Sequence, residues 1–570
     1  MNAERLLKHY ERIADAPDAI ARLRRFILDL AVRGKLAPQD SMDEPAAELL
    51  KRIAAEKAQL VKAGEIRNPK PIQALSEPPF SIPSNWRWSQ IAEIGVLNPR
   101  NEAPDATEAS FVPMPLIAAE YGVANKYEVR PWGEIKKGYT HFADGDVGLA
   151  KITPCFENGK STVFWNLTGG IGSGTTELHV VRPLFVDQNY ILIFFKSPHF
   201  IETGVPRMTG TAGQKRVPPE YFAHSPFPLP PLAEQRRIVA KVDELMALCD
   251  QLEMARAKRE AARDRLAAAS LARLNAPDPG TFKDDGRFAL DTLPALATRP
   301  DQIKQLRQTI LNLAVRGKFV PQDPQDEPAS ELLKRIVGAK GCSRHTSISV
   351  DGEAEPYSVP ASWKWTALDE LITIGPQNGI SPKPTNREDA PMAITLTATT
   401  SGVFNPAYFK RVEANVPEDS DFWLREGDLL FQRGNTREYV GIAAVYKGPS
   451  RTFLFPDLIM KVRVSDLVSL RFIHLAAISP PARAYLSANA SGAQATMPKI
   501  NQTTLVSLPI PLPPLAEQHR IVAKVDALMA LCDRLEASLD AVATTRRRLL
   551  DALLAEALAP AEPQVLDMAG

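Results

Sequence analysis

The segment Glu157-Asn-Gly-Lys-Ser161 ends like a phosphate-binding loop, in which backbone N–H groups and a lysine would hold the phosphates of a nucleotide. That pattern also requires a glycine at position 154, where this chain has Pro154. Because proline has no backbone N–H group, it removes a donor from the phosphate cradle. Nucleotide binding by this chain is therefore not predicted.

Other residues that could do chemistry also lack the necessary pattern. Ser76-Glu-Pro-Pro-Phe80 is similar to the Pro-Pro-aromatic loop of amino-methyltransferases, but Glu77 occupies the key position and no Gly-rich cofactor turn is nearby. We interpret this segment as a linker. The eight histidines show no metal-ligand spacing, and the four cysteines lie far apart without a Cys-x-x-Cys pair. We predict no catalytic residue, no metal site and no cofactor held by this chain.

Composition limits the class of protein. A chain of 570 residues with 44% hydrophobic residues is too long for a single core, so several packed units are expected. The start of the chain carries charges every few residues, unlike a signal peptide, and no apolar stretch is long enough to cross a bilayer. The cysteine usage fits a reducing compartment, so we expect a cytoplasmic protein. The net charge of +1 says little about nucleic acid, because DNA binding needs only a local basic surface.

The chain contains a long internal repeat. Residues 20–53 match residues 303–336 at 24 of 34 positions, and residues 228–253 match residues 511–536 at 23 of 26 positions. Both matches have an offset of 283 residues, so the chain is a tandem duplication of one unit. Between the two repeated blocks the copies barely resemble each other. We therefore expect the matched blocks to form a shared framework and the divergent middles to bind two different targets.

The repeated blocks have helical patterns. The first block predicts helices that end at Gly34 and Gly317, since glycine readily adopts the left-handed cap conformation. In the second block, apolar residues recur at alternating spacings of four and three, which predicts a coiled-coil seam. We expect the two seam helices to pair with each other as an antiparallel coiled coil. The residues of this spacer-helix seam are Ile238, Val242, Leu245, Cys249 and Leu252, repeated as Ile521, Val525, Leu528, Cys532 and Leu535.

Together these patterns predict an α+β fold with pseudo-two-fold symmetry. Short β-type runs at 161–165, 177–181 and 442–446 indicate that the divergent middles are mixed α/β domains separated by long helices. Each middle follows a Pro-x-x-Trp-x-Trp motif, in which Trp86/Trp88 and Trp363/Trp365 are predicted core or strand anchors. The predicted parts are an amino-terminal helical arm (1–79), a first variable domain (80–228), a central helical spacer (229–345), a second variable domain (346–511) and a carboxy-terminal helical spacer (512–570).

One repeated motif carries a family resemblance. Pro-Leu-Pro-Pro-Leu-Ala-Glu-Gln-x-Arg-Ile-Val-Ala-Lys-Val-Asp, at 228–243 and 511–526, closes each variable domain and opens a long helix. With it, the whole chain resembles the DNA-specificity subunits of type I restriction-modification systems. Segments 145–160, 172–177 and 427–435 are similar to parts of that family's target-recognition domains.

The resemblance implies a non-catalytic subunit that reads double-stranded DNA. Each variable domain would read one half of a bipartite asymmetric site. The chain would bind two modification (methyltransferase) subunits and, with them, restriction subunits that translocate and cut DNA. Adenine methylation, S-adenosylmethionine, ATP and Mg²⁺ would belong to these partners. A helix of about 40 residues spans roughly 60 Å, more than the roughly 34 Å between adjacent major-groove half-sites, so the helices would set the distance between the readers.

Base reading in the major groove needs side chains able to make paired contacts, chiefly Arg, Lys, Asn and Gln. A basic residue is shared where Lys215-Arg-Val217 aligns with Pro498-Lys-Ile500, which suits phosphate contact better than sequence reading. The DNA-binding candidates in the first domain are Lys151, Asn158, Lys160, Thr175, Thr176, Gln214, Lys215 and Arg216. Those in the second domain are Arg433, Asn435, Thr436, Arg437, Gln494, Lys499, Asn501 and Gln502.

Two alternatives from other classes predict different observations. A chain that itself methylates or cuts DNA would need a cofactor loop or a nuclease cluster, and the sequence shows neither. An interaction scaffold whose variable domains bind proteins would have no salt-sensitive affinity for DNA.

Overall fold

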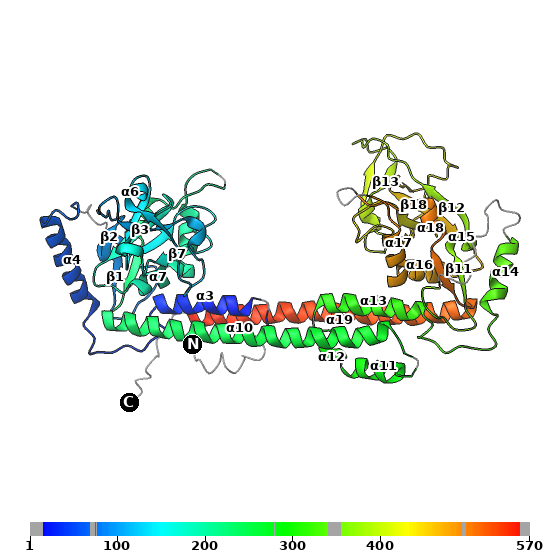
Figure 1. Ribbon diagram of the computed structural model, residues 1–570, viewed down its shortest axis with the longest axis horizontal. Helices are drawn as coiled ribbons and strands as arrows, with labels where there is room; N and C mark the ends of the chain where they lie inside the picture. Colours follow the sequence, from blue (N-terminus) through cyan, green and yellow to red (C-terminus); the bar gives the residue numbers. More distant parts are fainter. Residues whose placement is uncertain are drawn as a thin grey trace, which may run out of the picture. The chain divides into compact units, whose positions relative to one another are not determined.

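The computed structural model describes residues 15–558 except 17, 69–74, 76, 212, 279, 340–354 and 493–496. It divides into two units, which we describe separately. Unit 1 is Met1–Arg259 with Ala543–Gly570, and unit 2 is Glu260–Val542. Each unit combines a framework of helices with one sheet-rich variable domain, which we call its recognition domain after the family resemblance (Figure 1).

The framework of unit 1 begins with helix α3 (Ala19–Val32), which ends before Gly34 as predicted. Gly34 has φ +66°, and a Cβ added there would lie 2.5 Å from Pro83 Cγ and 3.2 Å from Trp86 Cζ2. The glycine is therefore required both for its left-handed conformation and for the close approach of the Pro-x-x-Trp motif. Unit 2 repeats this arrangement after helix α13 (Pro300–Val315), where Gly317 has φ +65°. The second framework helices, α4 (Ala46–Lys62) and α14 (Ala329–Ala339), begin directly after the repeated sequences Asp43-Glu-Pro45 and Asp326-Glu-Pro328.

A short antiparallel strand pair closes each recognition domain. In unit 1, β1 (Arg87–Gln90) pairs with β10 (Pro226–Leu229), and Arg87 lies opposite Leu229. In unit 2, β11 (Lys364–Ala367) pairs with β19 (Pro509–Leu512) in the same register. The chain therefore enters and leaves each domain through adjacent strands. The predicted tryptophan anchors are confirmed here, since Trp86 and Trp363 are 1% and 5% exposed just before these strands.

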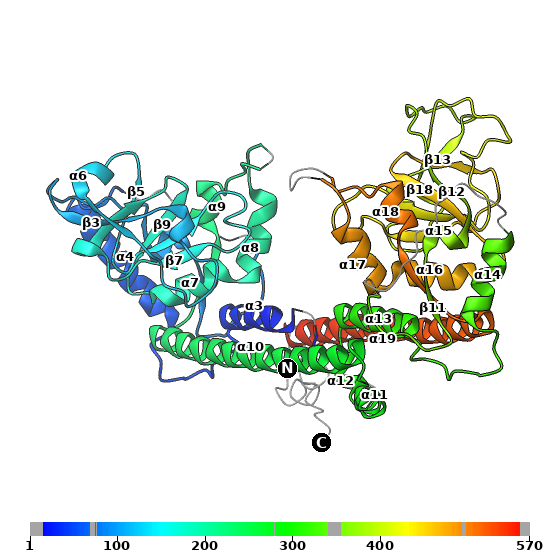
Figure 2. The same cartoon turned by 45° about the vertical axis from the view of Figure 1, so that its right-hand side comes forward.

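The recognition domain of unit 1 contains two four-stranded sheets, in the orders β2-β9-β6-β7 and β4-β3-β8-β5. Helix α7 packs against β6 and β7 on one side and against α3 on the other, so it joins the domain to the framework (Figure 2). The predicted runs at 161–165 and 177–181 are strands β7 and β9. The strands are β2 (Gly95–Leu97), β3 (Glu108–Val112), β4 (Glu128–Pro131), β5 (Thr140–Ala143), β6 (Val147–Ala150), β7 (Ser161–Val163), β8 (Ile171–Gly174) and β9 (Leu178–Pro183). The helices are α5 (Ile91–Ile94), α6 (Trp132–Ile135), α7 (Gln188–Lys196), α8 (Pro198–Gly204) and α9 (Pro219–His224), with 3₁₀ turns η1 (Met114–Leu116), η2 (Thr168–Gly170) and η3 (Val205–Arg207).

The recognition domain of unit 2 has a four-stranded sheet in the order β12-β18-β15-β16 and a three-stranded sheet in the order β14-β13-β17. The predicted run at 442–446 is strand β16. The strands are β12 (Ile372–Asn378), β13 (Met392–Ile394), β14 (Phe409–Arg411), β15 (Leu429–Gln432), β16 (Ala443–Val445), β17 (Phe453–Leu454) and β18 (Ile459–Val464). The helices are α15 (Leu368–Leu371), α16 (Leu470–Ile478), α17 (Pro480–Ala488) and α18 (Gln502–Val506), with the 3₁₀ turn η4 (Leu396–Ala398). The framework of unit 2 also contains α11 (Phe282–Asp291) and α12 (Leu293–Leu296).

Two helices of 44 residues, α10 (Leu232–Asn275) and α19 (Leu515–Leu558), carry the predicted seam. The first part of each helix packs against the recognition domain that precedes it. Ile238, Val242 and Cys249 belong to the core of unit 1 with residues of α3 and α7, and Leu245 packs against this core. Ile521, Val525 and Cys532 have the same place in unit 2, with Leu528 and Leu535 packed against them. The packing partners of these seam residues lie within their own unit, which corrects only the expectation that the seam residues of one copy pack against those of the other. Apolar spacing shows that one face is buried but does not identify what covers it.

The last part of each long helix packs on the framework of the other repeat copy. Leu550 and Leu553 of α19 cover Ala16 and Ala19 in unit 1. In unit 2, Ala267 and Leu271 of α10 pack against Leu313 of α13. Unit 1 is thus completed by the last part of α19, which is distant in the sequence, whereas unit 2 is one continuous stretch that begins within α10.

Candidate nucleic-acid interface

Side chains of the repeated Ala-Glu-Gln motif connect each recognition domain to the first turn of its long helix. Glu234 in the first turn of α10 is fully buried and accepts a hydrogen bond from Gln39. Burial raises the pKa of the Glu234 carboxyl. Gln235 accepts the backbone N–H of Asp187 at 2.8 Å and donates to Pro230 O. The corresponding residues of unit 2, Glu517 and Gln518, make the same set of bonds, with Gln322, the Ser469 N–H and Pro513 O. Residues identical in both copies therefore position the domains and cannot distinguish two targets.

Three loops of the first recognition domain meet where β6 ends and β9 begins. The Lys151 N–H donates to Glu177 O at 3.0 Å, and the Val217 N–H donates to Lys151 O at 2.7 Å. The Thr153 N–H donates to Lys215 O at 3.0 Å. These bonds bring six of the eight sequence candidates into one cluster, formed by Lys151, Thr175, Thr176, Gln214, Lys215 and Arg216.

An ion pair lies at the centre of this cluster. Arg216 donates from Nε to Glu177 Oε2 and from Nη2 to Glu177 Oε1, each at 2.9 Å. Its Nη1 donates to Gln214 O at 3.2 Å. The Arg216 side chain is 44% exposed and that of Glu177 is 23% exposed. The guanidinium holds the pKa of the Glu177 carboxyl below its usual value, so both groups are charged. Lys215, by contrast, is exposed and has no ion-pair partner among the described residues.

The remaining two candidates lie on the turn between Pro154 and Lys160. Asn158 is exposed at the tip of the turn. Lys160 is half-buried, and its Nζ donates to Met114 O at 3.3 Å, so the ammonium is directed away from the cluster. The buried Lys196 fixes this turn by donating to Gly159 O at 3.1 Å and to Ala119 O at 2.8 Å. Burial lowers the pKa of Lys196 to about 7.

The second recognition domain builds an equivalent cluster. The Arg433 N–H donates to Leu458 O at 2.7 Å, and the Ile500 N–H donates to Arg433 O at 2.8 Å. Lys499 forms antiparallel bridges with Gly434 and Ser491, as Arg216 does with Ile152 and Thr209. These bonds make Arg433 the counterpart of Lys151, and Lys499 the counterpart of Arg216. Glu177 has Leu458 as its counterpart, so Lys499 has no carboxylate at the place where Arg216 has one.

The other candidates of the second domain surround this cluster. Asn435 donates to Gln432 Oε1, and its own side-chain oxygen accepts the Thr436 N–H. Asn501 caps α18 by accepting the Thr504 N–H at 2.7 Å, so its acceptor is already engaged. Thr436, Arg437, Lys499 and Gln502 are exposed. Gln494 lies outside the described residues.

Sequence reasoning did not nominate Glu177 or Lys196. Glu177 is 39 residues from Arg216 along the chain, and no local pattern links the two. A comparison of Glu177 with Leu458 could have signalled that the two domains differ at an otherwise equivalent place.

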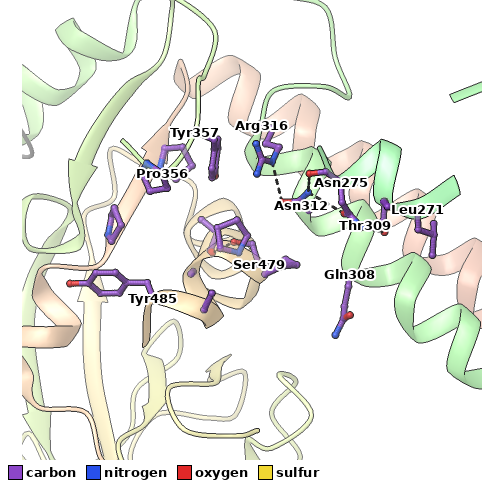
Figure 3. A pocket seen from close by; sticks show the side chains of 18 of the residues that line it. Leu271, Asn275, Gln308, Thr309, Asn312, Arg316, Pro356, Tyr357, Ser479 and Tyr485 are labelled. Atoms are coloured by element: carbon purple, nitrogen blue, oxygen red, sulfur yellow. Dashed lines mark hydrogen bonds between the residues drawn. The ribbon is translucent and has the colours of Figure 1, made fainter. Parts of the chain in front are cut away.

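The cavity found in unit 2 is not part of this interface. It has a volume of about 800 Å³ and lies between the end of α10, α13 and α17. Figure 3 shows Arg316 beside Tyr357, with its guanidinium 4.0 Å from the ring centroid, and Asn312 bonded to Asn275. None of the candidate residues lines this cavity. Within the described part of the chain, no group of three potential metal ligands gathers and no helix is long and apolar enough to cross a membrane.

Comparisons with known proteins agree with this arrangement. Residues 360–544 match the family model described as the type I restriction modification DNA specificity domain. The chain is 41% identical to the type I restriction enzyme EcoEI specificity subunit of Escherichia coli, over 95% of this chain and 94% of that protein. It is 38% identical to the EcoAI specificity subunit of Escherichia coli, over 94% and 93% of the two chains.

A solved structure from work on complex assembly and conformational transition of the type I R-M system shares the fold. Its TM-score is 0.51 at 20% identity, over 84% of this chain and 99% of that one. The match along nearly the whole length of two specificity subunits indicates a DNA-recognition subunit without a catalytic role of its own. This chain belongs to the family of type I restriction-modification DNA-specificity subunits.

Proposed function

We propose that the two recognition domains read the two different halves of a bipartite, asymmetric DNA site. The observation that carries this proposal is the pair of equivalent clusters with different side chains. Lys151, Glu177 and Arg216 in the first domain correspond to Arg433, Leu458 and Lys499 in the second. Because the helices and strands around both clusters are repeated, the different side chains are the part of the molecule suited to reading different bases.

We further propose that the long helices act as spacers. At 1.5 Å per residue, a helix of 44 residues is about 66 Å long, which exceeds the roughly 34 Å of one helical turn of DNA. Each helix is anchored in a recognition domain by its first part. A continuous helix is a stiff connection, so the separation of the half-sites would be fixed by the protein.

Two modification subunits are the proposed partners, because a repeated surface offers two equal docking sites. Leu248 on α10 and Leu531 on α19 are repeat counterparts, and both are 46% exposed. Leu252, a predicted seam residue, is 36% exposed and not buried, and it lies one helical turn after Leu248 on α10. Apolar side chains at helical spacing on an exposed face suit contact with a partner helix. Restriction subunits would join through the modification subunits.

The chemistry is assigned to these partners in this proposal. They would hold S-adenosylmethionine, ATP and Mg²⁺, methylate adenine and cleave DNA, while this chain selects the site. With chromosomal and invading DNA as substrates, the proposed compartment is the cytoplasm.

The test is the methylated motif of the assembled complex. The full chain is expressed with the modification subunits of its own host, and methyladenine is mapped across the DNA of the expression strain. We expect one motif with two unlike halves separated by a fixed number of unspecified bases. A motif without two separated halves, or DNA binding whose affinity does not change with salt, would contradict the proposal.

A further inference from the structure

The two equivalent clusters differ most in charge around their shared basic residue. Arg216 is held by both oxygens of Glu177, whereas Lys499 has Leu458 at the corresponding place. A cation that meets only phosphate needs no fixed orientation, and a neighbouring carboxylate would weaken its attraction to the phosphate. The Arg216–Glu177 pair is therefore poorly suited to phosphate contact, in contrast to Lys499.

The bonding of the guanidinium leaves a defined part of it available. An arginine has five N–H donors, and three of those of Arg216 are engaged by Glu177 and by Gln214 O. One N–H remains on each terminal nitrogen, Nη1 and Nη2. Guanine presents two adjacent acceptors, O6 and N7, in the major groove, and two parallel arginine donors match them. With 44% of its side chain exposed, Arg216 can present these donors to a ligand.

We propose that Arg216 reads a guanine in the first half-site and that Glu177 is the positioning residue that orients it. This inference rests on the proposed function, because it assigns one base of the half-site read by the first domain. It revises the sequence-based expectation that the aligned basic residues Arg216 and Lys499 both contact phosphate. Of these two aligned residues, Lys499 retains the role of a phosphate contact.

The informative variant is Glu177→Leu, which reproduces the arrangement of the second domain. Removal of the carboxylate frees the orientation of Arg216 and also removes one negative charge from the DNA-facing cluster. We expect discrimination at one base pair of the first half-site to fall by about tenfold to a hundredfold, the usual value of a bidentate base contact. Affinity for an unrelated duplex should rise and become more salt-dependent, because Arg216 gains access to phosphate. A misfolded variant would instead lose both the discrimination at this base pair and the affinity for the unrelated duplex.

The experiment uses the full chain assembled with its modification subunits. Sites are selected from a randomised duplex library, and affinity for a fixed unrelated duplex is measured across salt concentrations. Arg216→Lys keeps the charge and loses the paired donors, so it should reduce discrimination at the same base pair. Glu128→Leu is the matched control, because it removes the carboxylate from another surface pair of the same domain, with Arg130, and changes the net charge equally. The control should leave the selected motif unchanged.

The outcomes separate this inference from the proposed function. Relaxation of a single guanine position in one half-site, with the other half unchanged, supports it. An unchanged motif in both Glu177→Leu and Arg216→Lys overturns it while leaving the proposed function intact. Equal loss at all positions of both halves overturns it as well. If the unmodified complex selects no sequence, the proposed function itself is contradicted.

Discussion

Substitution of Gly34 by alanine tests how the repeated framework holds each recognition domain. Gly34 has φ +66°, and a Cβ added there would lie 2.5 Å from Pro83 Cγ. Gly64, after helix α4 in the same unit, has φ +76° with no atom within 4 Å of an added Cβ. The two substitutions therefore share the backbone strain, and only Gly34→Ala adds the clash.

The magnitudes follow from these two terms. A left-handed alanine costs about 1 to 2 kcal/mol, partly offset by about 0.4 to 1 kcal/mol from the lower entropy of the unfolded chain. At the middle of both ranges, Gly64→Ala should therefore destabilise by about 1 kcal/mol. Overpacking against a proline ring costs about 1 to 3 kcal/mol more, which gives about 2 to 4 kcal/mol for Gly34→Ala. For a cooperative unit of about 290 residues, 1 kcal/mol corresponds to about 2 °C in Tm.

Calorimetry of the full chain checks this prediction. Gly34→Ala should lower the Tm of one transition by about 4 to 8 °C, and Gly64→Ala by about 2 °C or less. Gly317→Ala, with Pro360 Cγ also 2.5 Å from the added Cβ, should act equally on the transition of unit 2. Equal shifts for Gly34→Ala and Gly64→Ala would refute the contact with the Pro-x-x-Trp motif as the reason for the glycine.

Three further outcomes are expected. Lys215→Ala and Lys499→Ala should each weaken binding of the assembled complex to all sequences alike. Each should also reduce the slope of log affinity against log salt concentration by about 1. A changed recognition sequence would contradict a phosphate contact. Burial lowers the pKa of His179 in the folded protein to about 4. As the pH falls below about 6.5, this imidazole is therefore protonated in the unfolded chain before it is protonated in the folded protein. The free energy of unfolding, measured by denaturant titration, should fall by about 3 kcal/mol between pH 6.5 and pH 4. His179→Gln should reduce this loss. An equal loss in this variant would mean that the histidine is already charged in the folded protein. A fragment of residues 1–280 lacks the α19 segment that covers Ala16 and Ala19, and a second copy can supply its α10 segment there. We expect a two-fold dimer that selects an inverted repeat with the modification partner, and a monomer in sedimentation would contradict this.

The repeat made much of the framework predictable. Two matched blocks at one offset identified the helices before Gly34 and Gly317, and the repeated Pro-x-x-Trp-x-Trp motif identified the tryptophans that anchor β1 and β11. Local patterns were sufficient there, because helix ends and strand ends are determined by nearby residues. The partner of the seam was not predictable in the same way. The spacing of Ile238 and Val242 indicates a buried face, but the recognition domain that covers it is formed by residues distant in the sequence.

The candidate interface was predicted by residue type, and the geometry shows which of the candidates lie together. Six first-domain candidates meet because backbone hydrogen bonds join three loops, which residue types alone did not reveal. Lys160 had the expected chemistry but points to Met114 O, and the contribution of Glu177 depends on a pairing across 39 residues. Side-chain direction and long-range pairs are properties of the folded domain, so composition and spacing could not supply them.

The central claim is that two independent readers are mounted on one repeated framework. It is tested most directly by replacing residues 364–512 with a second copy of residues 87–229. Both segments begin and end in the same antiparallel pair, with Arg87 opposite Leu229 and Lys364 opposite Leu512, so the graft preserves the connection to the long helices. The methylated motif of this chain with its modification subunits should become an inverted repeat of the first half-site. Retention of the original asymmetric motif, or loss of the first half-site with the second retained, would contradict the claim.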